Sequence, residues 1–509
     1  MLSPSRVLVS SIAAALVSPT LVASNHVWVN PADGAFDAPH VWLGGVPGPA
    51  DVAEFGLRAS TVPFFVTVES DIEIGGLIVE DQRPLLDLQA HAFDVGGSIA
   101  VGGFSTFHPT LVLSNGLCQA SEVKVGDRPG SASLTVDWSI LAVDVGEGDV
   151  LMATDALADA TLTITGFDSP FGVPATLYAD NVTVGALGQG SLLVDDSCYV
   201  ECNGSLILGA AASGDGLLEA LQGAKVVANA MRVGEEGRAE MALAGAVAIT
   251  NDVTLGGTGS SLALSFGAFL ASETLTMKSE GENVLSATNS EVLIGDVVID
   301  ASGPAIIDLS DSFFYVERSL ELMQQFGGPP PELRVRGSGS RVLGEGNITS
   351  GLNGQSIVSI SDGGLVVVSG SVQFGIGSEL QLTIEQDQSA FIECGAFTAD
   401  GHLSLALAPG VTFGPGQTIP LVTAGKVTGF FGAVSLPPGV VGSVVYHSNE
   451  IVLTTTAAQL GDLTGDGVVG AADLSFLLGD WGLHGSPADL NNDGVVSAGD
   501  LAILLAEWG

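Results

Sequence analysis

Short apolar stretches, separated by glycine or small polar residues, follow one another from about residue 60 to residue 455. Within a stretch, apolar and polar side chains alternate, which is the pattern of a β-strand with one buried face. The turns recur at a fixed interval of 22 residues, at Gly223-Ala224, Gly245-Ala246, Gly267-Ala268, Asn289-Ser290 and Asp311-Ser312. Asparagine and aspartate replace glycine here because they tolerate the left-handed backbone of a tight turn.

A period near 22 residues is the length of one coil of a parallel β-helix. The sequence therefore predicts an all-β fold, a right-handed parallel β-helix over residues 61–400. About 17 coils stacked at about 4.8 Å would form a rod on the order of 80 Å long. A leucine-rich repeat would show a recurring asparagine-leucine signature, which is missing. An array of β-sandwiches is the remaining alternative, but it would not keep one glycine register over successive units.

Both ends of this repeat region differ from its middle. Residues 24–60 are rich in aromatic side chains, which predict a cap over the open apolar end of the solenoid: Trp28, Phe36, Trp42 and Phe55. Carbohydrate binding by the tryptophans is the alternative to packing. The segment, with its later Asp51-x-Ala53-x-Phe55, resembles the start of exported bacterial passenger-type β-helix proteins, and residues 401–453 resemble their closing β segment. Loops are predicted at 168–175 and 324–333.

Residues 1–23 have the pattern of a signal peptide, in which Arg6 precedes an apolar run and small residues follow at Ala23 and Ser24. A membrane anchor is the alternative, but serine and proline interrupt the run. We therefore expect a secreted, extracellular protein that associates with the cell surface and does not insert into a membrane after cleavage.

Charge narrows the classes of partner. The 57 acidic and 14 basic residues give a formal net charge of −43, which repels phosphate backbones and excludes nucleic-acid binding. Such acidity either confers solubility or collects divalent cations, and the second interpretation needs a motif. The four cysteines, Cys118, Cys198, Cys202 and Cys394, are too sparse for a disulfide framework and are predicted to be buried free thiols.

The motif is at the C-terminus, where one pattern occurs at 462–482 and is repeated at 489–509. Each copy places oxygen-bearing residues at the positions by which a calcium loop surrounds Ca²⁺, with a glycine at the sharp turn. Two Ca²⁺ sites are predicted. In the first, Val468 supplies a carbonyl, and water serves at Gly470. In the second, Val495 supplies a carbonyl, and Ser497 acts through water. The predicted ligands are Asp462, Thr464, Asp466, Val468 and Asp473, and then Asp489, Asn491, Asp493, Val495, Ser497 and Asp500.

A helix is predicted after each loop, and the twelfth position is Asp, which together resemble the dockerin type I module. The resemblance covers residues 460–509, after a linker at 454–459, and implies calcium-driven folding and a cohesin-like partner. The residues that dockerins use for recognition differ here, because Ala471-Ala472 and Ala498-Gly499 replace polar pairs and no Lys or Arg follows Lys426. An apolar protein partner or self-association therefore stays open beside a cohesin.

Catalytic motifs are not evident in the sequence. Asp195-Asp196 and the pair Arg334 and Arg336 faintly resemble polygalacturonase residues, but the companion motifs are missing, and the seven histidines have no ligand spacing. The sequence thus predicts a non-catalytic surface or matrix protein with no catalytic residues assigned. Two alternatives remain: a polysaccharide-active enzyme, either a glycoside hydrolase or a lyase, and a glycan-binding adhesin.

Overall fold

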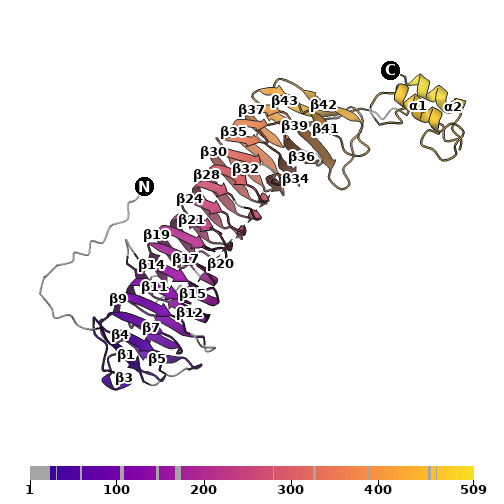
Figure 1. The fold of residues 1–509 in the computed structure, drawn as a ribbon. Helices are drawn as coiled ribbons and strands as arrows, with labels where there is room; N and C mark the ends of the chain where they lie inside the picture. The colour runs from indigo at the N-terminus through magenta and orange to yellow at the C-terminus, as the bar shows by residue number, and fades with distance from the viewer. Residues whose placement is uncertain are drawn as a thin grey trace.

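Figure 1 shows a computed structural model in which stacked strands form a long rod, with two short helices near the C-terminus. The structure describes residues 23–508 apart from 30, 58–59, 104–107, 145–147, 167–173, 196, 279, 325–327, 353, 387–389, 457–459 and 466. The predicted signal peptide, apart from Ala23, lies outside the described residues, as do most of the predicted loop at 168–175, half of the predicted linker, Asp196 and Asp466.

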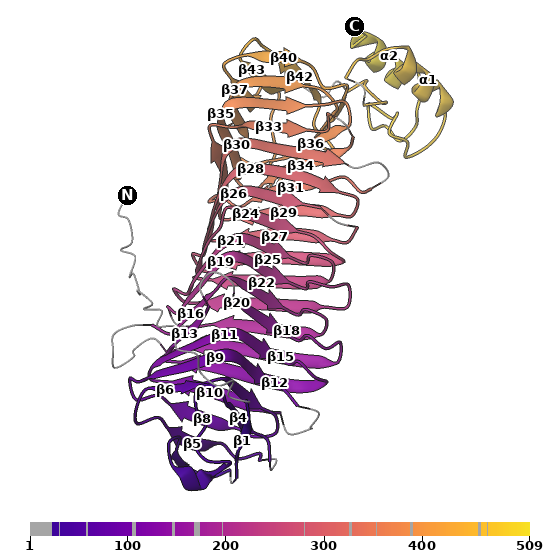
Figure 2. The ribbon, with the colours of Figure 1, turned by 60° about the vertical axis from the view of Figure 1, so that its left-hand side comes forward.

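The rod is an all-β parallel solenoid of about 15 turns, as the turn period predicts. Each coil adds one strand to each of two parallel sheets (Figure 2). In the first sheet some coils supply two short strands in place of one long strand. Its strands are β1 (Asn25–Trp28), β3 (Trp42–Leu43), β4 (Val52–Phe55), β6 (Ile72–Ile74), β7 (Gly76–Val79), β9 (Ala92–Val101), β11 (Leu117–Val125), β13 (Ile140–Val143), β14 (Asp149–Met152), β16 (Thr176–Ala179), β17 (Asn181–Val184), β19 (Tyr199–Leu208), β21 (Lys225–Val233), β23 (Val247–Ile249), β24 (Asp252–Leu255), β26 (Phe269–Met277), β28 (Glu291–Ala301), β30 (Phe313–Gln324), β32 (Arg341–Gly344), β33 (Asn347–Ser350), β35 (Leu365–Phe374), β37 (Ile392–Ala399), β39 (Thr418–Ala424), β40 (Val427–Gly429), β42 (Gly442–Tyr446) and β43 (Glu450–Thr455).

The second sheet contains one strand from each coil, and each strand pairs in parallel with the next. Its strands are β2 (Gly34–Ala35), β5 (Phe64–Thr67), β8 (Pro84–Asp87), β10 (Thr110–Ser114), β12 (Gly130–Asp137), β15 (Ala158–Thr165), β18 (Gln189–Val194), β20 (Asp215–Leu221), β22 (Arg238–Ala244), β25 (Gly259–Ser265), β27 (Asn283–Thr288), β29 (Ala305–Ser310), β31 (Glu332–Arg336), β34 (Ser356–Ser361), β36 (Ser378–Ile384), β38 (His402–Leu407) and β41 (Ala433–Ser435).

A long strand of the first sheet forms two walls of a coil. In β26, buried and outward side chains alternate up to Ser272, the phase shifts at the exposed Glu273, and alternation resumes at Thr274. The ladder to β28 skips Glu273 in the same place. Because side chains alternate between faces along a strand, this phase shift marks a bend. Each coil therefore has three walls, two from the first sheet and one from the second.

The turn register is confirmed by the backbone. Gly223, Gly245 and Gly267 have φ values of 83°, 67° and 80°, and Asn289 and Asp311 have 48° and 49°. These five residues adopt the left-handed conformation for which glycine, asparagine and aspartate are suited. The expected 17 coils are slightly too many, because insertions lengthen several coils. One insertion lies between Ile140 and Thr176, which are paired on adjacent coils.

The core is one cluster of buried apolar side chains that extends from Trp28 to Leu453. At its N-terminal end the aromatic residues are packed and buried, as predicted: the rings of Trp28 and Trp42 lie 5.0 Å apart, as do those of Phe36 and Trp42. The parallel ladders end in antiparallel pairs, β1 with β3 at one end and β39 with β43 and β43 with β42 at the other. These pairs occupy sheet edges that would otherwise be open.

The prediction of free cysteines is confirmed. None of the four cysteines forms a disulfide; Cys118, Cys198 and Cys202 are buried as predicted, whereas Cys394 is only partly buried. Burial raises the pKa of Cys202 to about 12 and that of Cys394 to about 11, so both stay protonated at neutral pH. In the described part of the chain, no helix has the length and apolar character needed to cross a membrane.

The C-terminal region contains two short helices, α1 (Ala471–Gly479) and α2 (Ala498–Ala506). They share a small apolar cluster of their own, separate from that of the rod, formed by Val469, Leu477, Ala488, Leu490, Val496 and Leu504. The helices follow the two predicted calcium loops, as the sequence pattern indicates. Their assignment to a dockerin-like module stays a prediction.

Candidate functional site

The first acidic loop is organised by carboxylates that accept hydrogen bonds from its backbone. Asp462 Oδ1 accepts from the Gly465 N–H and its Oδ2 from the Gly467 N–H, both at 2.8 Å. Asp473 Oδ1 accepts from the N–H and the hydroxyl of Thr464, and its Oδ2 accepts from the Gly470 N–H, all at 2.8 Å. Asp473 thereby joins the start of the loop to the start of α1. Val468 is half exposed, and the predicted ligand Asp466 lies outside the described residues.

The second acidic loop repeats this arrangement. Asp489 Oδ2 accepts from the Gly494 N–H at 2.8 Å and its Oδ1 from the Asp493 N–H at 3.1 Å. Asp500 Oδ1 accepts from the Asn491 N–H at 3.1 Å, and its Oδ2 accepts from the Ser497 N–H at 2.7 Å. The Asn491 side-chain amide donates to Asp493 Oδ2, and its Oδ1 accepts from the Asp493 N–H. Hydrogen bonds within the loop thus link Asp489, Asn491, Asp493, Ser497 and Asp500, and the Val495 N–H donates to Asp493.

The start of α2 has a side-chain cap that α1 lacks. Ser497 precedes α2, and its hydroxyl accepts from the Gly499 N–H at 3.3 Å. Gly470 occupies the same place before α1 and has no side chain to do so. A serine cap satisfies one of the unpaired N–H groups at a helix start. We therefore expect the first loop to be the weaker of the two predicted calcium sites.

Asp473 and Asp500 are fully buried. Burial alone would raise their pKa, but the hydrogen bonds from their own loops outweigh it, so the pKa of each lies below the usual 3.8. Gly470 and Thr464 donate to Asp473, while Ser497 and Asn491 donate to Asp500. Among the described residues, neither carboxylate has a cationic side chain as partner. Both negative charges are therefore held inside loops that offer only N–H and hydroxyl donors.

The chemistry of these loops fits Ca²⁺, because carboxylate, amide, hydroxyl and carbonyl oxygens are its preferred ligands. In the described part of the chain, no three His, Cys, Asp or Glu side chains come close enough together to hold a metal ion. Asp489 and Asp493 direct their oxygens at backbone N–H groups of the loop instead. Ca²⁺ binding therefore stays a prediction, and the buried, cation-free Asp500 is the observation that favours it.

The two helices also expose apolar side chains, which occupy equivalent positions in the two copies of the repeated pattern. Leu478 and Leu505 are each 52% exposed, while Trp481 and Trp508 are 46% and 45% exposed. No lysine or arginine lies in this region.

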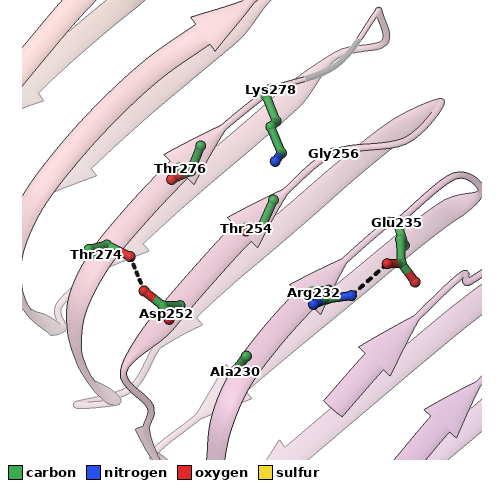
Figure 3. A pocket seen from close by; sticks show the side chains of 10 residues that line it. Ala230, Arg232, Glu235, Asp252, Thr254, Gly256, Thr274, Thr276 and Lys278 are labelled. Carbon is green, nitrogen blue, oxygen red and sulfur yellow. Dashed lines mark hydrogen bonds and ion pairs between the residues drawn. The ribbon is translucent and has the colours of Figure 1, made fainter. Parts of the chain in front are cut away.

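The rod carries a groove that the sequence reading did not identify (Figure 3). Its volume is about 510 Å³, and it crosses β21, β24 and β26 on the wall formed by the C-terminal halves of the long first-sheet strands, called here the second wall. Arg232 donates to Glu235 at 2.7 Å, and Lys278 points into the groove without an ion pair to any described residue. Thr254, Thr274 and Thr276 also line the groove, and the Thr274 hydroxyl donates to Asp252. The turn period stacks these positions on successive coils. Aligning the coils by that period would therefore have placed the groove residues side by side.

The residues considered for catalysis are not brought together. Asp195 follows β18, and the two arginines lie on β31, six strands further along the second sheet, or roughly 29 Å at the usual strand spacing. Arg336 forms an ion pair with Asp308, and Arg334 with Glu332. These arginines are engaged by neighbouring carboxylates on the surface of the rod.

Comparison with known proteins gives no match: no family model, no curated protein and no solved structure resembles this chain significantly.

Proposed function

We propose that this chain is a secreted, non-catalytic protein of the cell surface or extracellular matrix. In this proposal a rigid, right-handed β-helical rod is attached through a dockerin-like module at residues 460–509, which folds around two Ca²⁺ ions. The rod is supported by its continuous apolar core, and the module by the separate apolar cluster around α1 and α2. Its partner is a cohesin-like domain or another protein with an apolar surface, which would contact the exposed Leu478, Trp481, Leu505 and Trp508.

The observation that carries the proposal is the duplicated loop, in which a fully buried aspartate bonds back to the third and ninth residues of its own loop. Burying a carboxylate is costly unless its charge is compensated. Ca²⁺ would compensate it in both loops. Asp462, Thr464, Asp466, Asp473 and the carbonyl of Val468 would hold one ion. Asp489, Asn491, Asp493, Asp500 and the carbonyl of Val495 would hold the other, with Ser497 acting through water.

Calcium titration of the full chain by calorimetry tests this proposal. We expect two sites in the natural protein and one in Asp493→Ala, because the second loop loses a central ligand. Asp480→Asn is the matched control, since Asp480 lies between the loops and bonds Ser486 rather than loop residues. Two sites in Asp493→Ala, or no calcium binding in the natural protein, would contradict the ligand assignment.

The groove on β21, β24 and β26 supports a second candidate function, binding of a neutral glycan. Its two cations and two carboxylates balance, and its threonine hydroxyls offer donors and acceptors to a polyhydroxylated ligand. A binding assay on neutral and acidic polysaccharides tests this, with Thr254→Val and Thr276→Val expected to weaken binding. Release of reducing or unsaturated ends in the same assay would instead favour a polysaccharide-active enzyme.

A further inference from the structure

One wall of the rod is apolar on its outer face over seven successive coils. This apolar wall consists of two neighbouring ladders on the first sheet, from β21 to β35, whose side chains all point outward (Figure 2 shows these strands stacked). The first ladder is Val227, Ile249, Ala271, Leu293, Tyr315, Leu343 and Val367. The second is Lys225, Val247, Phe269, Glu291, Phe313, Arg341 and Leu365.

Each of the other two walls of the same coils carries a polar ladder, although the neighbouring ladder of the third wall contains Val284, Ile306 and Ile357. The second wall presents Asp252, Thr274, Asp296, Ser319 and Asn347 in one ladder. The third presents Ser286, Asp308, Arg334 and Ser359. On the apolar wall, by contrast, Phe313 is 48% exposed, and Leu293 and Ile249 are each 38% exposed. A continuous apolar surface of this kind on a water-soluble rod indicates a site of contact with another molecule.

Two of the three charges on the apolar wall, Glu291 and Arg341, are arranged symmetrically about Phe313, and the third, Lys225, lies at the end of the wall, four coils before Phe313. Glu291 lies one coil before Phe313 and Arg341 one coil after it on the same ladder. The two lie two coils apart, about 9.6 Å at the usual strand spacing, with Phe313 between them. Neither forms an ion pair with any described residue. The Arg341 guanidinium donates only to the carbonyls of Ser340 and Gly363.

We infer that the apolar wall is the contact between two antiparallel copies of this chain, related by a twofold axis that runs along the strand direction at the level of Phe313. This axis places Phe313 against Phe313 and Tyr315 against Tyr315. It also places Glu291 against Arg341 of the second copy, twice by symmetry. Leu293 then faces Leu343, and Phe269 faces Leu365. Both unpaired charges gain an opposite partner, as an isologous interface requires.

Charge complementarity favours a second copy of this chain in this orientation. With the axis along the rod instead, the two ladders would exchange places, and Glu291 would face Leu293 without a cation, which is unfavourable for a buried charge. Elsewhere two chains of net charge −43 repel one another. The apolar wall carries two cations and one anion among its fourteen positions, so it is a surface where two copies can approach.

The size of the apolar wall sets the expected affinity. With the axis at Phe313, the five coils from β26 to β35 face one another over roughly 24 Å by 12 Å, so two copies would bury roughly 600 Å² in total. That is below the usual range for permanent complexes. The dimer is therefore reversible, with a dissociation constant on the order of tens of micromolar.

Sedimentation equilibrium of the mature chain from about 1 to about 200 μM tests the inference, because this range brackets the expected dissociation constant. We expect a monomer–dimer equilibrium in the natural protein and at least a tenfold weaker one in Phe313→Glu, because a charge is introduced at the centre of the contact. Phe65→Glu is the control: Phe65 is an exposed phenylalanine on β5 of the second sheet and should leave dimerisation unchanged. A monomer at all concentrations would overturn the inference.

A charge exchange distinguishes the proposed axis from any other apolar association. Glu291→Arg and Arg341→Glu should each weaken the dimer about tenfold, and the double variant should restore it to within about threefold of the natural protein. Failure of the double variant to recover would contradict the proposed register. Dimerisation should also persist with a calcium chelator, and a dimer that chelator abolishes would place the contact at the C-terminal loops instead.

Discussion

The rod and the C-terminal fifty residues are held together by different interactions. The rod buries one apolar cluster from Trp28 to Leu453 and joins every coil to the next by parallel ladders. The C-terminal region buries only Val469, Leu477, Ala488, Leu490, Val496 and Leu504, and relies on buried Asp473 and Asp500 to organise its loops. The rod should therefore tolerate changes in ions and pH, whereas the C-terminal region should respond to both.

Removal of calcium should produce the largest difference between the two regions. A chelator should unfold residues 460–509 and leave the rod intact, because so small an apolar cluster does not stabilise fifty residues without the metal. Thermal melts followed by circular dichroism check this, since α1 and α2 are the only α-helices in the described chain and contribute the helical signal. Loss of helix and strand signals in one transition would contradict the division into two regions.

A cavity created in the rod should destabilise the rod and leave the C-terminal region unaffected. Phe314 is fully buried on β30, and Phe314→Ala should reduce the stability of the rod by about 3–5 kcal/mol through lost burial and the cavity left behind. Phe313→Ala, one residue earlier and exposed in the monomer, is the matched control at protein concentrations well below those at which the chain is proposed to dimerise. Urea unfolding followed by the strand signal checks this. Equal effects of the two substitutions would show that outward and inward positions on β30 are assigned wrongly.

Acid should weaken the C-terminal region before the rod. Because the pKa of Asp473 and Asp500 in the folded state lies below the usual 3.8, their ionised forms stabilise the fold above that pH. This stabilisation is lost as the pH falls from the ordinary aspartate pKa through the folded one. Calcium binding adds to the loss, since its ligands must be deprotonated.

The helical signal measured between pH 7 and pH 3 should therefore fall while the strand signal persists. Asp500→Asn should flatten part of this dependence, because its amide does not titrate. Asp480→Asn is the control and should leave the profile unchanged. A profile that is identical in all three proteins would show that Asp500 does not stabilise the loop through its charge.

The rod and the C-terminal region also differ in how much of each could be predicted from the sequence. The solenoid can be predicted from the sequence because successive coils repeat one turn. Residues that favour a left-handed backbone, such as Gly223 and Asn289, therefore mark the same turn in each of these coils. The groove and the apolar wall cannot be predicted from short stretches of the sequence. Their residues, such as Arg232 with Lys278, become neighbours only when coils are stacked, and insertions such as the one between Phe313 and Arg341 break the period. Each loop is encoded within one short stretch of sequence, so its hydrogen bonds could be anticipated.

The smallest expected effect lies within the C-terminal region, between its two loops. Gly470→Ser should give α1 the hydroxyl cap that Ser497 gives α2, stabilising the first helix by a few tenths of a kcal/mol. It also gives the first loop an oxygen at the position that Ser497 occupies in the second loop. The calcium affinity of the first site should therefore rise, and the dissociation constants of the two sites should become more similar. Ser497→Gly should do the reverse and separate the two steps. Calorimetric titration resolves the two steps, and if Gly470→Ser leaves them as far apart as before, the asymmetry of the loops originates elsewhere, with Thr464 in place of Asn491 the next position to exchange.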